Sequence, residues 1–389
     1  MKTLGAITIT LCALGVSAGV VFAHETLTTT VLFDREIVRI ISQHCVMCHA
    51  ERGPSFPLET YEQTFLQRRK IRTEIIARHM PPWAALPGYG QFANDNSLTL
   101  RETQFIVSWV EGLGPRNAGT VFTNVAGADS AHPKEIRAHA DFGNWQLGMP
   151  DLVRQLSSNT VEAGSANQVK RTVIDLGLST ERRVRAVEYM PGDRRVVHAA
   201  FFTVQETGQW IGSWTPWYGF MGLPKGVAYR VPAGAHVVAE IYYQGAKERV
   251  ADTGTLGLFF ADSPSGNLAS DLVLEAKGQI PAKAQSQKFR AEKPLAEDTY
   301  ALALRPELMP GAKSIEVSVR KPDGGTEVLL FAKDFPTAWP SPYIFKQPVL
   351  LPKGSQLAVT AYYGNSEAAA QPGGFRLTMS EYSMSGVRR

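Results

Sequence analysis

The chain has 389 residues and a formal net charge of +4, from 40 Lys and Arg against 36 Asp and Glu. Its apolar fraction of 44% and charged fraction of 20% are those of a folded globular protein, which excludes global disorder. The weak charge, with no dominant basic stripe, argues against a nucleic acid partner, and 3 Cys are too few for a disulfide scaffold of this size.

Residues 1–23 are predicted to be an export signal. Lys2 supplies the positive charge, an apolar stretch follows, and small residues precede His24, where a peptidase would cut. The alternative is an uncleaved anchor, because the stretch approaches the roughly 20 residues of a bilayer span. Cys12 would leave with the signal. We therefore expect a periplasmic or otherwise exported protein without a transmembrane span after cleavage, or a membrane-anchored one if the signal is retained.

Three short helices are predicted in the region that follows. Each begins at a residue type that caps helix N-termini, and the predicted capping residues are Asp34, Thr60 and Thr99. The second and third also show the capping-box spacing, with Gln63 and Glu102 three residues after the cap. The first helix would end just before the cysteines that remain in the mature chain.

These cysteines form the run Cys45-Val46-Met47-Cys48-His49, which is the attachment pattern of a c-type haem. Two thiols three positions apart can each add to one vinyl group of the haem, and the adjacent imidazole reaches the iron from one face. A redox-active cysteine pair or half of a zinc site are the alternatives, but no further zinc ligands or βαβ pattern lie nearby. The sequence predicts one covalent haem c, held by Cys45 and Cys48, with His49 as the proximal iron ligand.

The second iron ligand is expected in the loop between the second and third helices. Met80 lies there, followed by two prolines that would stiffen the loop. A thioether opposite an imidazole raises the reduction potential of a haem. Met80 is the predicted distal ligand, and His79 or an open coordination position are the alternatives.

The rest of the chain is predicted to be β-structure. Residues 118–143 are rich in small and polar residues and indicate a linker. From residue 144 onward, short alternating apolar runs are separated by turn sequences such as Pro322-Asp323-Gly324-Gly325. The pattern predicts two β-sandwiches, over residues 144–278 and 279–389, behind a helical domain at residues 24–117.

The helical region resembles a bacterial cytochrome c module that often precedes a copper type II, ascorbate-dependent monooxygenase-like region. The resemblance covers residues 30–117 and is carried by His79-Met80-Pro81-Pro82-Trp83, Pro87-Gly88-Tyr89-Gly90, Asn94-Asp95 and Trp109-Val110-Glu111-Gly112. The later region resembles the two-domain jelly-roll core of peptidylglycine-type copper monooxygenases, through Trp145 to Asp151, Val184 to Glu188, Val196-Val197-His198, Val231 to Gly234, Glu240 to Tyr243, Lys321 to Gly324, Tyr343 to Phe345 and Leu351 to Gly354. The resemblance implies a small all-α cytochrome c domain followed by two all-β jelly-roll sandwiches.

The family's copper ligands are largely missing from this chain. A paired His-His is replaced by His198-Ala199, a His-Tyr by Tyr242-Tyr243, a His-x-His by Pro306-Glu307-Leu308 and a Met by Tyr382. The chain has 8 His, and of these His198 and His236 are the ones in the β region. Copper prefers several imidazole ligands at each centre, so copper is not an expected cofactor and His198 is interpreted as a structural residue.

These patterns led to three hypotheses about function. The first is an exported monohaem c-type cytochrome that transfers single electrons to and from redox partner proteins, with the sandwiches as a docking or scaffolding unit. The alternative is a copper-dependent monooxygenase fed by the haem. A third is a module that binds a small apolar ligand or a protein on the β region, at an aromatic loop made of Trp210, Trp214, Trp217, Tyr218 and Phe220.

Overall fold

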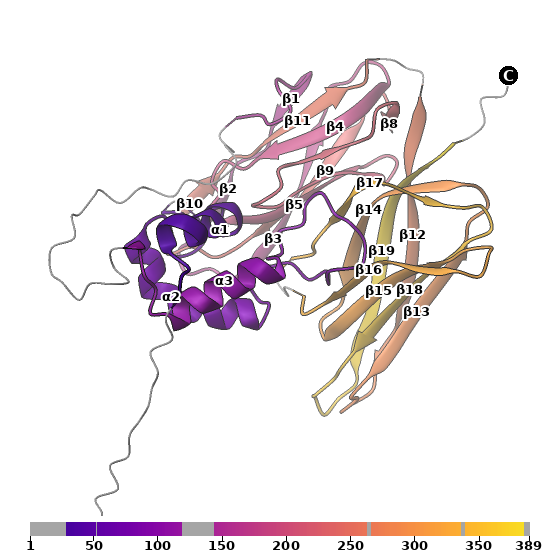
Figure 1. Cartoon of the computed structure of the whole chain (residues 1–389). Helices are drawn as coiled ribbons and strands as arrows, with labels where there is room; N and C mark the ends of the chain where they lie inside the picture. The colour runs from indigo at the N-terminus through magenta and orange to yellow at the C-terminus, as the bar shows by residue number, and fades with distance from the viewer. Residues whose placement is uncertain (1–28, 52, 119–143, 263–265, 336–338, 385–389) are drawn as a thin grey trace, which may run out of the picture.

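The computed structural model describes residues 29–51, 53–118, 144–262, 266–335 and 339–384. Strands dominate this part of the chain, and its helical turns all lie in residues 33–118 (Figure 1). The predicted signal and most of the predicted linker lie outside the described residues. Among the described residues, no helix combines the length and the apolar content that crossing a bilayer requires.

The helical region holds a π-helical turn, η1 (Phe33–Ile37), followed by α1 (Val38–His44), α2 (Tyr61–Ile76) and α3 (Leu100–Glu111). Both predicted capping boxes are confirmed, since Thr60 and Thr99 each accept a hydrogen bond from the backbone three residues on. The predicted cap at Asp34 is wrong, because the first turn already begins at Phe33 and no side chain caps it. A small apolar core built around Ile37, Ile41 and Trp109 holds these turns together.

Two facing sheets form the first β-sandwich. One contains β1 (Leu152–Gln155), β11 (Thr255–Phe260), β4 (Arg182–Met190) and β8 (Val227–Val231), with β7 (Phe220–Gly222) on β4. The other contains β3 (Gln168–Asp175), β9 (His236–Tyr243), β5 (Val197–Val204) and β6 (Trp210–Trp214), and β2 (Asn159–Val161) pairs separately with β10 (Val250–Asp252). Successive side chains of a β-strand point to opposite faces of its sheet. On β9 the apolar residues Val237, Ala239 and Ile241 are all buried on one face, and this face packs against the other sheet.

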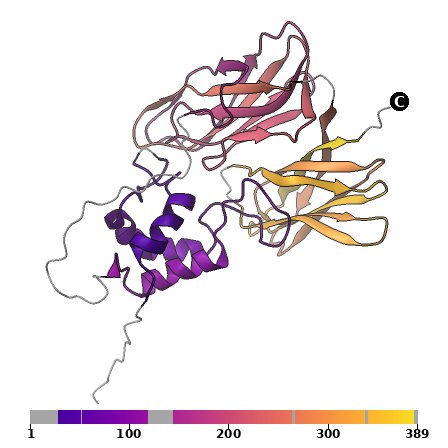
Figure 2. The same cartoon turned by 45° about the horizontal axis from the view of Figure 1, so that its top comes forward.

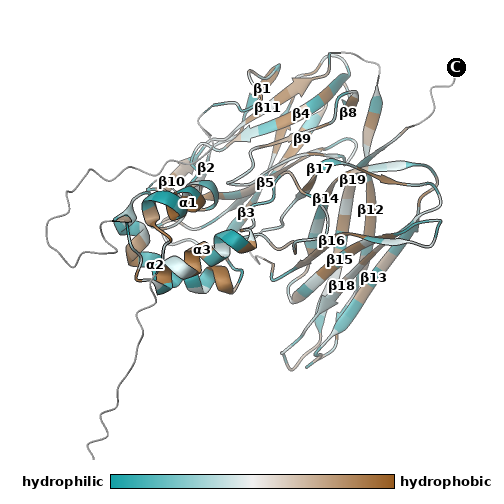
Figure 3. Cartoon of the chain, viewed as in Figure 1, coloured by the Kyte–Doolittle hydropathy of each residue, from teal (hydrophilic) through white to brown (hydrophobic). Residues whose placement is uncertain are grey.

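The second β-sandwich is built in the same way. One sheet contains β12 (Asn267–Ile280), β19 (Gln371–Ser383), β14 (Thr299–Leu308) and β17 (Tyr343–Leu351), and the other β13 (Gln287–Pro294), β18 (Gln356–Tyr363), β15 (Ala312–Arg320) and β16 (Thr326–Lys333). The start of β12 pairs in parallel with β8, so one sheet runs through both sandwiches. Brown apolar residues alternate with teal polar ones along many of these strands (Figure 3).

The segment between α2 and α3, residues 83–96, leaves the helices and joins the second sandwich; we call it the inter-helix segment. Figure 2 shows it reaching from the helices to the later strands. The Leu86 amide donates to the Phe331 carbonyl at 2.8 Å, and the Ala93 amide donates to the Ile344 carbonyl at 2.7 Å. Gly90 makes this approach possible, because its φ is +75° and an added Cβ would lie 2.4 Å from the Leu329 carbonyl oxygen.

The inter-helix segment also supplies core residues to the second sandwich. Trp83 and Phe92 are buried in the same apolar cluster as β14, β15 and β18, and both pack against Tyr343 with ring centroids 5.1 and 5.3 Å apart. The prediction of a small all-α cytochrome c domain ahead of two jelly rolls is therefore wrong. The chain is mostly β in its described part, and its few helices share their connecting segment with a sandwich core instead of forming a separate all-α unit.

Candidate functional site

The turn after α1 gathers the two thiols and the imidazole that the sequence singled out. The amides of Cys48 and His49 both donate to the Cys45 carbonyl, at 3.0 and 2.9 Å, which closes the chain into one tight turn. His49 Nδ1 lies 2.9 Å from the Phe56 carbonyl oxygen. Because a carbonyl can only accept, Nδ1 carries the proton and Nε2 is left as the nitrogen with a free lone pair.

Burial sets the protonation state of these groups. It raises the pKa of Cys45 to about 12 and that of Cys48 to about 11, although the Arg194 guanidinium opposes the shift at Cys48. Burial also lowers the pKa of His49, against the effect of the hydrogen bond to Phe56. Near neutral pH the site therefore holds two protonated thiols and a neutral imidazole.

A pocket of about 380 Å³ opens in front of this turn, within the usual size range of small-molecule sites. One wall comes from the helical region and includes Cys45, Cys48 and His49. The opposite wall comes from the β region and includes His198, Gln244, Trp217 and Trp339. The pocket is thus shared between the helices and the sandwiches, an arrangement that the sequence did not predict.

Hydrogen bonds hold the two walls together. The Gln244 side-chain amide donates to the Pro54 carbonyl at 3.0 Å, and the Trp217 indole N–H donates to the Asn94 carbonyl at 3.0 Å. Sequence reasoning missed Gln244 and Trp339. No motif marks either residue, because their role comes from contacts across the fold.

The structure separates the two candidates for a distal ligand. Met80 lines the pocket although its side chain is 43% exposed. His79 does not line it, and its largely exposed ring has Nδ1 3.1 Å from a Glu74 carboxylate oxygen. The loop therefore presents the thioether and turns the imidazole to the surface.

The two histidines of the β region lie in different surroundings. Burial lowers the pKa of His198 to about 4, so this imidazole is neutral, and its ring packs edge-on against Trp339 at 4.2 Å. His236 lies near the surface and pairs with Glu206 at 2.9 Å. In the residues that the structure describes, no group of three or more His, Cys, Asp or Glu side chains is arranged to hold a metal ion.

The aromatic loop is mainly core. Trp210 and Trp214 are fully buried inside the first sandwich, whereas Trp217 reaches the pocket wall. Most of this loop is therefore inaccessible to a ligand or a partner.

Comparisons with known proteins do not assign a family. No family model matches the chain, and no curated protein matches it. Among solved structures it is similar to the major capsid protein P2 of bacteriophage PM2, at 11% identity and a TM-score of 0.27, over 59% of this chain and 100% of that one. It is also similar to PNGF-II, at 10% identity and a TM-score of 0.25, over 60% of this chain and 66% of that one. At such scores the likeness carries no argument about fold or function.

The first two functional hypotheses are wrong for this structure. A one-electron-transfer cytochrome with a scaffolding β region does not agree with a mostly β chain that has no separate cytochrome domain in its described part. A copper-dependent monooxygenase does not agree with the lack of any metal-binding cluster among the described residues. These findings do not test covalent attachment at Cys45 and Cys48, which stays a prediction.

Proposed function

We propose that the protein is a haem-binding protein that attaches a c-type haem covalently in the pocket between its helices and its sandwiches. The observation that carries the proposal is the placement of two thiols and a neutral imidazole within one turn on the wall of a pocket of about 380 Å³. Cys45 and Cys48 would form the thioether bonds and His49 would bind the iron.

The donor set fits this group in its chemistry, since two free thiols and a neutral imidazole line one pocket. Both thiols are free rather than joined in a disulfide, and each would add across one vinyl group, with the thiol hydrogen passing to the other vinyl carbon. No oxidant is needed for that step. The hydrogen bond from His49 Nδ1 to the Phe56 carbonyl fixes the orientation of the imidazole. Histidines that bind metals commonly donate such a hydrogen bond from the ring nitrogen that does not bind the metal.

The bound group would contact both parts of the chain. When present, a haem supplies an iron centre whose reactivity is set by its axial ligands. Met80 lines the pocket and is the proposed residue on the second face. The neutral His198 and the Gln244 amide line the β side and would shield the site from water.

Attachment of this kind takes place outside the cytoplasm. The proposal therefore includes export directed by residues 1–23, which lie outside the described part of the chain. Nothing in the proposal requires copper.

The test is to express the full chain in a bacterial periplasm that has a c-type haem attachment system. Wild-type protein should keep haem through denaturing electrophoresis and show stoichiometric iron without copper. Cys48→Ser should lose stable attachment, whereas Ser55→Ala, which also changes a residue of the pocket lining, should keep it. A wild-type protein without covalent haem, or a normal haem stain in a Cys45→Ser, Cys48→Ser double variant, would overturn the proposal.

A further inference from the structure

A second pocket, of about 400 Å³, lies where α2 ends and α3 begins, and we call it the helix-end pocket. Its lining comes from the end of α2 with the loop that follows, from the inter-helix segment and the residues just after it, and from the first turn of α3. All of these residues fall within 75–103, a continuously described part of the chain. Ile75, Met80, Pro81 and Leu98 lie between this pocket and the one in front of the thiols, since they line both.

The wall of the helix-end pocket is mostly apolar and partly open to solvent. Leu100 is 75% exposed, Ile76 is 52% exposed and Met80 is 43% exposed. Trp83 lies deeper, at 7% exposed, and packs against Tyr343 of the second sandwich. Large apolar side chains left exposed around one pocket are typical of a binding surface. A hydrocarbon chain placed there would remove them from water.

A single charge interrupts this apolar wall. In the described chain Arg78 is the only charged residue of the lining, and its exposed side chain makes no ion pair or hydrogen bond with another described residue. The carboxylate nearest along the sequence, that of Glu74, lies 3.1 Å from His79 Nδ1 instead. An unpaired guanidinium beside apolar surface is matched by a carboxylate that carries a hydrocarbon chain.

The backbone of Arg78 gives a second reason to look for a ligand. Its φ is +60°, in the left-handed region, where glycine is the usual residue after a helix. The carbonyls at the end of α2 do not need the guanidinium. That of Ile75 accepts from the Arg78 amide at 3.1 Å, and that of Glu74 accepts from the next amide at 2.9 Å. An arginine kept here at a conformational cost therefore indicates a role other than capping the helix.

We infer that the helix-end pocket binds a carboxylate with an unbranched hydrocarbon chain, a ligand of the fatty-acid class. The carboxylate pairs with Arg78, and the chain lies against Ile76 and Leu100. The site is independent of the proposed haem attachment, because it uses neither the thiols nor His49.

The experiment uses decanoate as the probe, with 1-decanol as the matched probe that has the same chain and no charge. Binding to the full chain is measured by saturation-transfer NMR titration. Decanoate should bind about fivefold to tenfold more tightly than 1-decanol, the gain expected of one charge-assisted pair at a partly exposed site. Shorter carboxylates should bind more weakly, by about twofold to fourfold for each methylene removed.

Variants locate the site. Arg78→Gln should weaken decanoate binding by about fivefold to tenfold. Arg69→Gln is the matched control, because Arg69 is another exposed arginine with an unpaired side chain in the described chain but lies outside the lining. Leu100→Asn should weaken binding by about threefold or more. Its control is Leu66→Asn, where the leucine is 77% exposed and lies outside the lining.

Arg78→Gly separates binding from folding. Glycine adopts the left-handed conformation without strain, so this variant should be at least as stable as the wild type in urea unfolding. It should nevertheless bind decanoate as weakly as Arg78→Gln does. No binding of decanoate, equal binding of both probes, wild-type binding in Arg78→Gly, or equal losses in the control variants would overturn the inference.

Discussion

Replacing Asn94 by alanine should destabilise the protein strongly, because this side chain fastens the inter-helix segment to the second sandwich. Asn94 is 2% exposed. Its Nδ2 donates to the Pro342 carbonyl at 2.8 Å, and its Oδ1 accepts from the Ile344 amide at 3.0 Å. Asn94→Ala leaves both backbone groups buried without a partner, at about 1–3 kcal/mol each, so the free energy of unfolding should fall by about 2–6 kcal/mol.

The assay is equilibrium unfolding in urea, combined with hydrogen exchange at the Ile344 amide. The matched control is Gln91→Ala in the same segment, where the side chain is exposed and the change should stay within about 0.5 kcal/mol. Exchange at Ile344 should accelerate in Asn94→Ala and not in the control. If both variants lose the same small amount of stability, then the inter-helix segment is not part of the core of the second sandwich.

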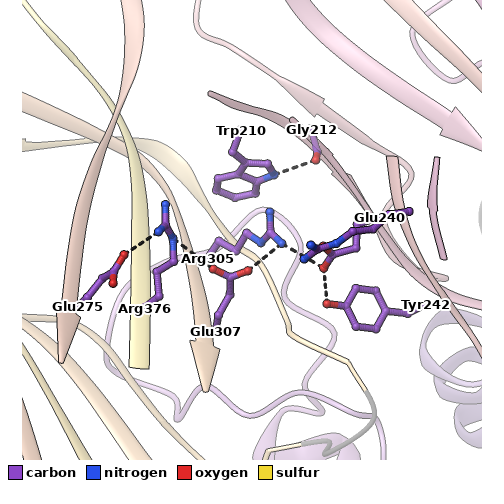
Figure 4. Close-up of polar contacts among 9 residues, drawn as sticks. Trp210, Gly212, Glu240, Tyr242, Glu275, Arg305, Glu307 and Arg376 are labelled. Atoms are coloured by element: carbon purple, nitrogen blue, oxygen red, sulfur yellow. Dashed lines mark hydrogen bonds and ion pairs between the residues drawn. The ribbon is translucent and has the colours of Figure 1, made fainter. Parts of the chain in front are cut away.

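Two further predictions concern buried charges near the junction of the sandwiches. Arg305 forms ion pairs with Glu240 and Glu307 (Figure 4). Arg305→Met should reduce the free energy of unfolding by an amount near the lower end of the about 3–5 kcal/mol that is typical of a broken buried ion pair, because Glu240 keeps its ion pair with Arg171. A double-mutant cycle with Glu240→Gln measures the coupling energy between Arg305 and Glu240, and a value near zero would contradict the pairing. Burial raises the pKa of Asp271 to about 7, against a hydrogen bond from the Trp210 amide. Because the pKa of Asp271 is higher in the folded protein than in the unfolded chain, its protonated form stabilises the fold fully below about pH 4, and this stabilisation is lost as the pH rises through 7. Asp271→Asn cannot titrate, so its Tm should fall less than the wild-type Tm between about pH 5 and 8. Parallel curves of Tm against pH would refute this.

The sequence predicted local structure well where the signal lies in adjacent residues. The capping boxes at Thr60 and Thr99 start helices as expected, since both partners of each box lie within one turn. The alternating runs predicted strands for the same reason. The sequence did not predict that the inter-helix segment crosses to the second sandwich, because the contacts of Asn94 and Phe92 join residues about 250 positions apart.

The same distinction applies to the site. Cys45, Cys48 and His49 are adjacent in the chain and could be singled out by spacing alone. The sequence predicts a structural role for His198, whereas the fold places it on the pocket wall with Gln244 and Trp339. The residues of this wall come from separate strands, so no fixed spacing along the sequence relates them and no motif marks them.

The bond between Asn94 and Pro342 also sets an order of events during synthesis. These residues are 248 positions apart, and at about 5–20 residues per second a ribosome needs roughly 12 to 50 s to make the intervening chain. The inter-helix segment therefore stays without its partner strand until most of the chain has been made, so its docking onto the second sandwich is a late step in the folding of the protein.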